Sequence, residues 1–275
     1  MLFRNSYMTP GPGVERDTPR KTGLPRFFEL LGRDLPNLYK ASFLAGLGGL
    51  PAILLVGFGI STKSILITLG GALLTGWLVG PCLCGAFDTT LRALRDEAGY
   101  WWSTYRRAFK ANFKGSLLSG IVFTAIVSIQ VLVCTTLLEN GVTSVFTWVM
   151  MLLNLFLGTG FFSYYWAQMV LVDTTLSQRI KNSCLMFIGF LPQTLAATVF
   201  QLFYWALLYL LMPFSIILFL VFGCWLPLLV GLMIIYPSMD RVLHIEETLY
   251  ERHKDDYKGE IDWGNPEEDP DDSQS

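Results

Sequence analysis

The sequence offers few side chains of the kinds that catalyse reactions or hold metals. Its two histidines, His244 and His253, lie in the charged segment after the last apolar run, without the partners that a zinc or general-base site needs. Cys82 and Cys84 form a C-x-C pair within an apolar run, and the other three cysteines are scattered with no metal-ligand spacing. No P-loop, G-x-S-x-G or H-E-x-x-H motif occurs. We therefore expect no enzymatic activity and no metal or other cofactor.

The polar groups inside the apolar runs are mostly amides, hydroxyls and aromatic rings. They could contact a neutral polyol, or they could join helices by hydrogen bonds and form aromatic belts at the membrane interfaces. The candidate core contacts are Gln130, Asn154, Gln168, Gln193, Gln201, Tyr165 and Trp166. No Asp, Glu, Lys or Arg lies in these runs, which argues against a proton relay or a coupled transporter of ions or acids.

The runs that would position these groups predict an all-α membrane protein. Hydrophobic residues make up 52% of the 275, charged residues only 15%, and the mean hydropathy is +0.46. A membrane helix needs roughly 20 consecutive apolar residues. Six runs satisfy this, near residues 41–60, 65–87, 116–138, 143–172, 184–211 and 213–236.

The positions of Lys and Arg predict the orientation. Nineteen of the 20 lie on one side of a six-span arrangement and only Lys63 lies on the other, and cytoplasmic loops are the ones enriched in cations. We expect a multi-pass plasma-membrane protein with both termini in the cytoplasm. Its parts would be a mobile N-terminus (1–23), an interfacial helix (24–39) that Pro36 kinks or ends, a membrane domain (40–240) and an acidic tail (241–275).

A weak internal repeat marks the ends of the spans. The pattern Lys-x-Ser-x-Leu precedes the first, third and fifth runs, and an acid follows the second, fourth and sixth. The marks are Lys40, Lys114 and Lys181 at the starts and Asp88, Asp173 and Asp240 at the ends. Lys can reach lipid headgroups and Asp-Thr-Thr suits the start of a helix. This predicts three hairpins that begin and end in the cytoplasm, although Lys-x-Ser before an apolar run also arises by chance.

The segment 88–114 stands out because it is basic and aromatic between two uncharged runs. Its aromatic residues recur at helical steps, with basic residues opposite, so it is expected to lie as an amphipathic helix in the headgroup layer, with Gly99 dividing it into two. The alternative is a docking surface for a cytoplasmic partner. The residues concerned are Trp101, Trp102, Tyr105, Arg107, Phe109 and Lys110.

Residues in and around this segment resemble a known family, and the likeness covers roughly residues 26 to 240. Gly80-Pro81, Ala93, Arg95 and the run from Thr104 to Lys114 followed by Ser116-Leu117 are similar to the YesL-like family of small bacterial membrane proteins. The resemblance implies a bacterial plasma membrane and a link to carbohydrate uptake, and it supplies no catalytic or binding residues. The expected function is that of a non-enzymatic, transport-associated or accessory subunit. The alternative is a membrane scaffold or regulator that docks partners through 88–114 and the acidic tail.

The expected partners follow from the same features. They are the lipid bilayer together with transporter subunits or a cytoplasmic protein, and not a nucleic acid.

Overall fold

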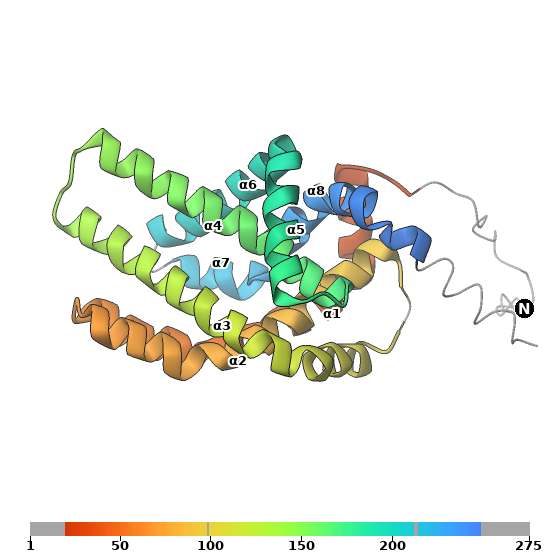
Figure 1. Cartoon of the computed structure of the whole chain (residues 1–275), viewed down its shortest axis with the longest axis horizontal. Coiled ribbons are helices and arrows are strands. Elements are labelled where there is room, and N and C mark those ends of the chain that lie inside the picture. The colour runs from red at the N-terminus through yellow and green to blue at the C-terminus, as the bar shows by residue number, and fades with distance from the viewer. Residues whose placement is uncertain (1–19, 98, 212–213, 249–275) are drawn as a thin grey trace, which may run out of the picture. The chain divides into compact units, whose positions relative to one another are not determined.

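The computed structural model describes residues 20–97, 99–211 and 214–248, and these are helical apart from short connections (Figure 1). The helices are α1 (Leu24–Ser61), α2 (Ile65–Arg95), α3 (Trp101–Glu139), α4 (Val145–Leu171), α5 (Leu176–Gly189), α6 (Leu191–Leu210), α7 (Ser215–Phe222) and α8 (Trp225–Leu243). Most of the predicted N-terminal segment and the tail beyond residue 248 lie outside the described residues.

Six of the helices are long and apolar enough to cross a membrane, which confirms the predicted number of spans. They are α1, α2, α3, α4, α6 and α8. By length and composition this is a multi-pass membrane protein whose outward-facing apolar side chains would contact lipid.

The chain divides into two compact units, and the division falls between Leu35 and Pro36. In the first unit, the start of α1 carries the ion pair Arg26–Glu29, with its N–O distance of 3.3 Å. The expected end of a helix at Pro36 is not observed, because α1 continues through this proline to Ser61. The predicted interfacial helix and the first span therefore belong to one helix.

The basic segment 88–114 is not a separate interfacial helix. Its first part completes α2 and its second part opens α3, and the short connection between the two helices includes Gly99. Asp96 ends α2 in a left-handed conformation with φ of 60°, which turns the chain. Gly99 thus lies where a division was expected, whereas Asp88 lies inside α2 and starts no helix.

The last two predicted spans are each interrupted. The run 184–211 contains the end of α5 and all of α6, with the break at Phe190 just before Pro192. The run 213–236 divides into α7 and α8 at Gly223, whose φ of 48° and ψ of −147° suit only glycine. Pro227, the expected kink, occupies the first turn of α8 instead, where its missing N–H does no harm. The sixth candidate span therefore shifts to α8.

Small residues bring α2 and α3 into the most extensive helix contact of the described residues. A Cβ built on Gly120 would lie 2.5 Å from the carbonyl oxygen of Gly76 and 2.7 Å from the backbone nitrogen of Gly80. Gly80 in turn has no room for a Cβ beside the backbone of Ser116. Close backbone approach at small residues is the expected basis of helix association in membranes. The pair it joins links the first and second predicted hairpins.

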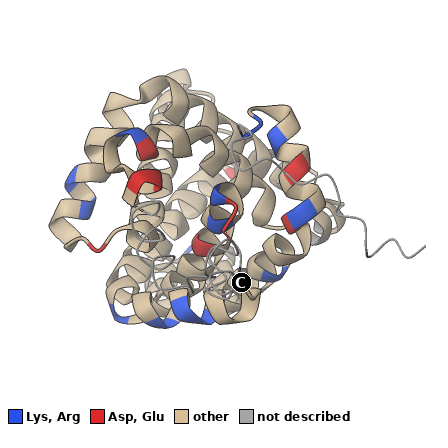
Figure 2. Ribbon diagram, turned by 90° about the vertical axis from the view of Figure 1, so that its right-hand side faces the viewer, with Lys and Arg blue, Asp and Glu red and all other residues tan. Residues whose placement is uncertain are grey.

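The turns between helices separate the charges along the second unit. The α1–α2 and α3–α4 turns lie at one end, at the left of Figure 1, where Lys63 and Glu139 form an ion pair of 2.6 Å. The end of α2, the start of α3 and the end of α8 lie at the opposite end, which carries most of the remaining charged residues (Figure 2). We call this the charged end.

Candidate functional site

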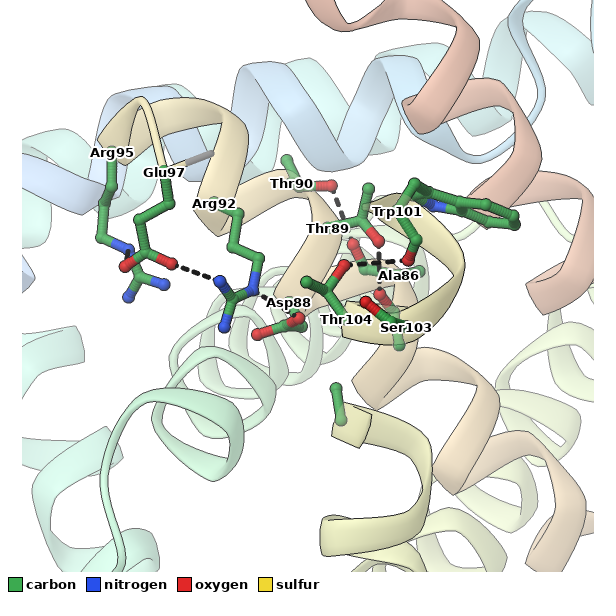
Figure 3. A network of polar contacts seen from close by, with 12 residues as sticks. Ala86, Asp88, Thr89, Thr90, Arg92, Arg95, Glu97, Trp101, Ser103 and Thr104 are labelled. Atoms are coloured by element: carbon green, nitrogen blue, oxygen red, sulfur yellow. Dashed lines mark hydrogen bonds and ion pairs between the residues drawn. The ribbon is translucent and has the colours of Figure 1, made fainter. Parts of the chain in front are cut away.

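A series of ion pairs lies at the C-terminal end of α2. Asp88 Oδ2 accepts a hydrogen bond of 2.9 Å from Arg92 Nε one turn later, and Arg92 Nη1 lies 2.6 Å from Glu97 Oε2 (Figure 3). Arg95 Nε contacts the other oxygen of Glu97 at 3.0 Å. Asp88 is only 6% exposed, so Arg92 compensates a carboxylate that is largely removed from water. These ion pairs hold Glu97, in the α2–α3 connection, against the last turns of α2.

Buried threonines beside Asp88 bond within their own helix. The hydroxyls of Thr89 and Thr90 donate to the carbonyl oxygens of Gly85 and Ala86, each at 2.9 Å, so that they carry no unsatisfied polar group into the interior (Figure 3). The second Asp-Thr-Thr behaves differently, because Thr175 forms a capping box at the start of α5. The same tripeptide therefore has two structural roles.

The remaining repeat marks also differ from one another. Lys40 lies over the ring of Trp101, with Nζ 5.4 Å from the ring centroid, whereas Lys114, Lys181 and Asp173 are exposed. Asp240 accepts a hydrogen bond of 2.9 Å from the backbone N–H of Glu246. Lys181 lies within α5 and opens no helix.

The aromatic side of the α3 start faces the protein and not its surroundings. Tyr105 is buried against Ala41 of α1 and Ala86 of α2, and Trp101 and Phe109 pack against this cluster. Gly85 leaves the space that the Tyr105 ring occupies. The packing attaches the first turns of α3 to α1 and α2.

The opposite side of the α3 start is a basic row. Trp102, Arg106, Lys110 and Lys114 are four residues apart and all are exposed, so they follow one line along the helix. Arg107 is exposed beside them. None of these four cations forms an ion pair with a described residue. We call these five residues the basic row.

The basic row belongs to the same helix as the third candidate span. The helix contains 39 residues, and roughly 20 suffice to cross the hydrocarbon. From Lys114 to Trp101 the axis advances about 20 Å, whereas the headgroup region is only about 5–8 Å deep on each side. α3 is therefore longer than its span requires, and the basic row lies in the part that the hydrocarbon does not need. The interfacial placement of this segment stays a prediction.

The amides and rings predicted as core contacts do not meet in one site. Gln168 Nε2 donates to Ser183 of α5 at 3.0 Å, Gln201 of α6 accepts from Ser163 at 3.3 Å, and Gln130 bonds to Asn154 at 2.9 Å. Each pair joins two helices, as expected for interhelical hydrogen bonds.

The other members of the predicted set are equally dispersed. The Tyr165 hydroxyl is hydrogen-bonded to Ser119, Trp166 is buried against Phe123, and Gln193 is exposed.

The sequence reading missed Arg179 as a buried residue. It is 8% exposed, its Nη2 donates to the carbonyl oxygen of Thr174 at 2.9 Å, and its guanidinium lies 5.7 Å from the centroid of the Tyr165 ring. Its burial could have been predicted from helical spacing, because Arg179 is four residues before Ser183 and seven before Met186, and all three lie on the buried side of α5.

A small cavity lies between the helices near the charged end. Its volume is about 10 Å³, which barely accommodates one water molecule. It is lined by Leu38, Ala41, Ser42, Ala86, Thr90, Cys224, Trp225 and Leu228. Its size fits a packing defect and not a sugar.

One segment of the chain matches a known protein family. Residues 60–132 match the model of a family described as "Protein of unknown function, DUF624". The matched segment includes α2, the series of ion pairs and most of α3, and therefore the whole basic row. No curated protein and no solved structure matches the chain.

Proposed function

We propose that this protein is a non-enzymatic membrane scaffold whose basic row binds an acidic surface of a cytoplasmic protein. The observation that carries the proposal is the row itself, with its four exposed cations and Trp102. Solvated cations with no ion-pair partner among the described residues can pair with carboxylates of another protein, and exposed Trp and Arg are enriched where proteins bind one another.

The packing that holds the helix behind the basic row supports a binding role. Binding loses less entropy when the interacting side chains project from a rigid backbone. Here the other side of the same helix is fixed by Tyr105, Trp101 and Phe109, and the connection before it is fixed by Arg92 and its two carboxylate partners. A partner would therefore meet a preformed surface.

The cytoplasmic location of the row is part of the proposal. It rests on the enrichment of cations in cytoplasmic loops, since Lys63 alone lies on the other side of the six spans. The length of α3, 39 residues where roughly 20 suffice to cross the hydrocarbon, favours a protein as the occupant over the lipid headgroups.

The class of partner comes from the resemblance to the YesL-like family. We propose a transport-associated role, in which the partner is a cytoplasmic or membrane subunit of a carbohydrate-uptake system. The uncharged membrane core agrees with an accessory role beside a transporter. The family that residues 60–132 match is described as one of unknown function, so it adds nothing to this assignment.

A site-specific photo-cross-linker tests the docking surface. Replacing Trp102 by benzoylphenylalanine in cells and irradiating them should join the protein to a subunit of the uptake system, identified by mass spectrometry. The variant Arg106→Glu/Lys110→Glu should reduce that adduct about tenfold. A matched control, Lys181→Glu/Arg241→Glu, changes the same charge on exposed residues outside the row and should leave the adduct intact.

Two outcomes would contradict docking at the basic row, and a third would reject the transport link alone. Adducts with phospholipid alone would assign the row to the membrane surface. Equal loss of the adduct in the control variant would show an effect of net charge and not of the row. Unchanged carbohydrate uptake after gene deletion would reject the transport link while leaving docking intact.

A further inference from the structure

Two amides meet on the outer surface of the membrane domain. Gln130 Nε2 of α3 donates a hydrogen bond of 2.9 Å to Asn154 Oδ1 of α4. Asn154 is exposed and Gln130 is half-buried. Gly158, one turn beyond Asn154, leaves room for the Gln130 amide, whose nitrogen lies 3.2 Å from where a Cβ would be. The pair is therefore accessible from outside the protein.

The amide pair lies close to the middle of the bilayer. Gln130 is nine residues before the end of α3 at Glu139, and Asn154 is nine residues after the start of α4 at Val145. At 1.5 Å per residue both lie about 14 Å from the α3–α4 turn, and the hydrocarbon core is about 30 Å thick. Water is absent at this depth, so polar groups need protein partners.

The observed hydrogen bond leaves both amides incomplete. Each side-chain amide has an NH₂ group and a carbonyl oxygen. With one bond formed, the NH₂ of Asn154 and the carbonyl oxygen of Gln130 have no partner among the described residues. An amide group without a hydrogen-bond partner is strongly destabilising in hydrocarbon. Exchanging nitrogen and oxygen in both amides would still leave one donor and one acceptor.

We propose that a second copy of this chain covers this surface. The leftover donor and acceptor complement each other, so a two-fold axis along the membrane normal would let Asn154 of each copy donate to Gln130 of the other. Both copies insert in the same direction, and their amide pairs therefore lie at the same depth. A two-fold interface uses the same surface on both partners, and this surface is self-complementary.

The small buried fraction of α4 agrees with a second copy of the chain at this surface. Only 11% of the most apolar part of α4 is buried within the described residues, the lowest share among the six candidate spans. Met150, Leu153 and Leu157 are exposed beside Asn154 and would form the apolar contact around the four amides. Interhelical hydrogen bonds between side-chain amides stabilise helix association in membranes.

Disulfide cross-linking in intact membranes tests the interface. Leu157→Cys, in a background carrying Cys134→Ala and Cys184→Ser, should form a covalent dimer on mild oxidation. The control Val199→Cys places a thiol on the similarly exposed surface of α6 and should remain monomeric. Equal cross-linking at both positions would indicate random collision and overturn the proposal, as would a monomer in both.

A double substitution tests the amides themselves. Gln130→Leu/Asn154→Leu in the Leu157→Cys background should reduce the dimer about tenfold or more, because up to two interchain hydrogen bonds are lost. Replacing both amides leaves no unpaired group, so the monomer should keep its thermal stability in detergent. Full cross-linking without the amides would overturn the proposal, and a thermal shift would reveal any misfolded variant.

Discussion

Ser42 Oγ of α1 accepts a hydrogen bond of 2.8 Å from the backbone N–H of Cys224, between residues 182 positions apart in the sequence. Cys224 lies at the break between α7 and α8, where the backbone N–H groups of a helix start lack helical partners. The Tyr204 hydroxyl donates to the carbonyl oxygen of the neighbouring Gly223 at 2.5 Å. Side chains of α1 and α6 thus satisfy the backbone at this break.

Ser42→Ala should therefore destabilise the protein more than an ordinary serine substitution. It leaves the Cys224 N–H without its acceptor, at a cost of about 1–3 kcal/mol, and thermal unfolding in detergent would measure the loss. Ser61→Ala is the matched control, because Ser61 is exposed and bonds only to the carbonyl oxygen of Gly57 in its own helix. Equal melting temperatures for the two variants would contradict the role assigned to Ser42.

Gly120→Ala should disrupt the α2–α3 contact. The added methyl group would lie 2.5–2.7 Å from backbone atoms of Gly76 and Gly80, which cannot move without shifting a helix. Overpacking of this kind costs about 1–3 kcal/mol. Thermal unfolding of the purified protein would measure it.

Gly115→Ala provides the comparison on the same helix. A Cβ at Gly115 meets no atom within 4 Å, so the substitution should be neutral or stabilising by up to about 1 kcal/mol. If both alanine variants melt alike, close packing of α2 against α3 does not limit stability.

The sequence is sufficient to predict the number of spans, because hydrocarbon thickness sets the length of an apolar run. It is not sufficient to locate the breaks at Phe190 and Gly223, since the residues on both sides of each are apolar. What distinguishes Gly223 is a conformation available only to glycine and a hydrogen bond from Tyr204, which depend on tertiary contacts. Hydropathy carries no information on either.

The candidate site was predictable in composition and not in orientation. Helical spacing correctly separates Tyr105 and Phe109 from Arg107 and Lys110 on two sides of one helix. The aromatic side was expected to face lipid or a partner, yet it packs on Ala41 and the rest of its cluster. Periodicity shows that two sides differ, and only the tertiary fold decides which of them is covered.

Arg92→Met should destabilise the protein more than the loss of a surface ion pair would. It removes the cation that compensates Asp88, whose side chain is only 8% exposed, and leaves that carboxylate buried. Breaking a buried pair in this way costs about 3 kcal/mol or more. The expected result is a clear drop in melting temperature. Asp88→Asn should be milder, because Arg92 keeps Glu97 as its partner at 2.6 Å, and a larger loss for Asp88→Asn would contradict the assigned roles.

Lys63→Met and Glu139→Met should each have a small effect, although their ion pair is as short as that of Arg92 with Glu97. The side chains of Lys63 and Glu139 are 62% and 54% exposed, so water screens the attraction between them. Exposed pairs contribute about 0–1 kcal/mol. A double-mutant cycle, repeated in high salt, would measure the coupling energy, which should fall toward zero as salt is added because the Debye length shortens. A coupling energy above about 2 kcal/mol that resists salt would contradict this expectation. It would show that exposure does not determine which of these ion pairs is strong.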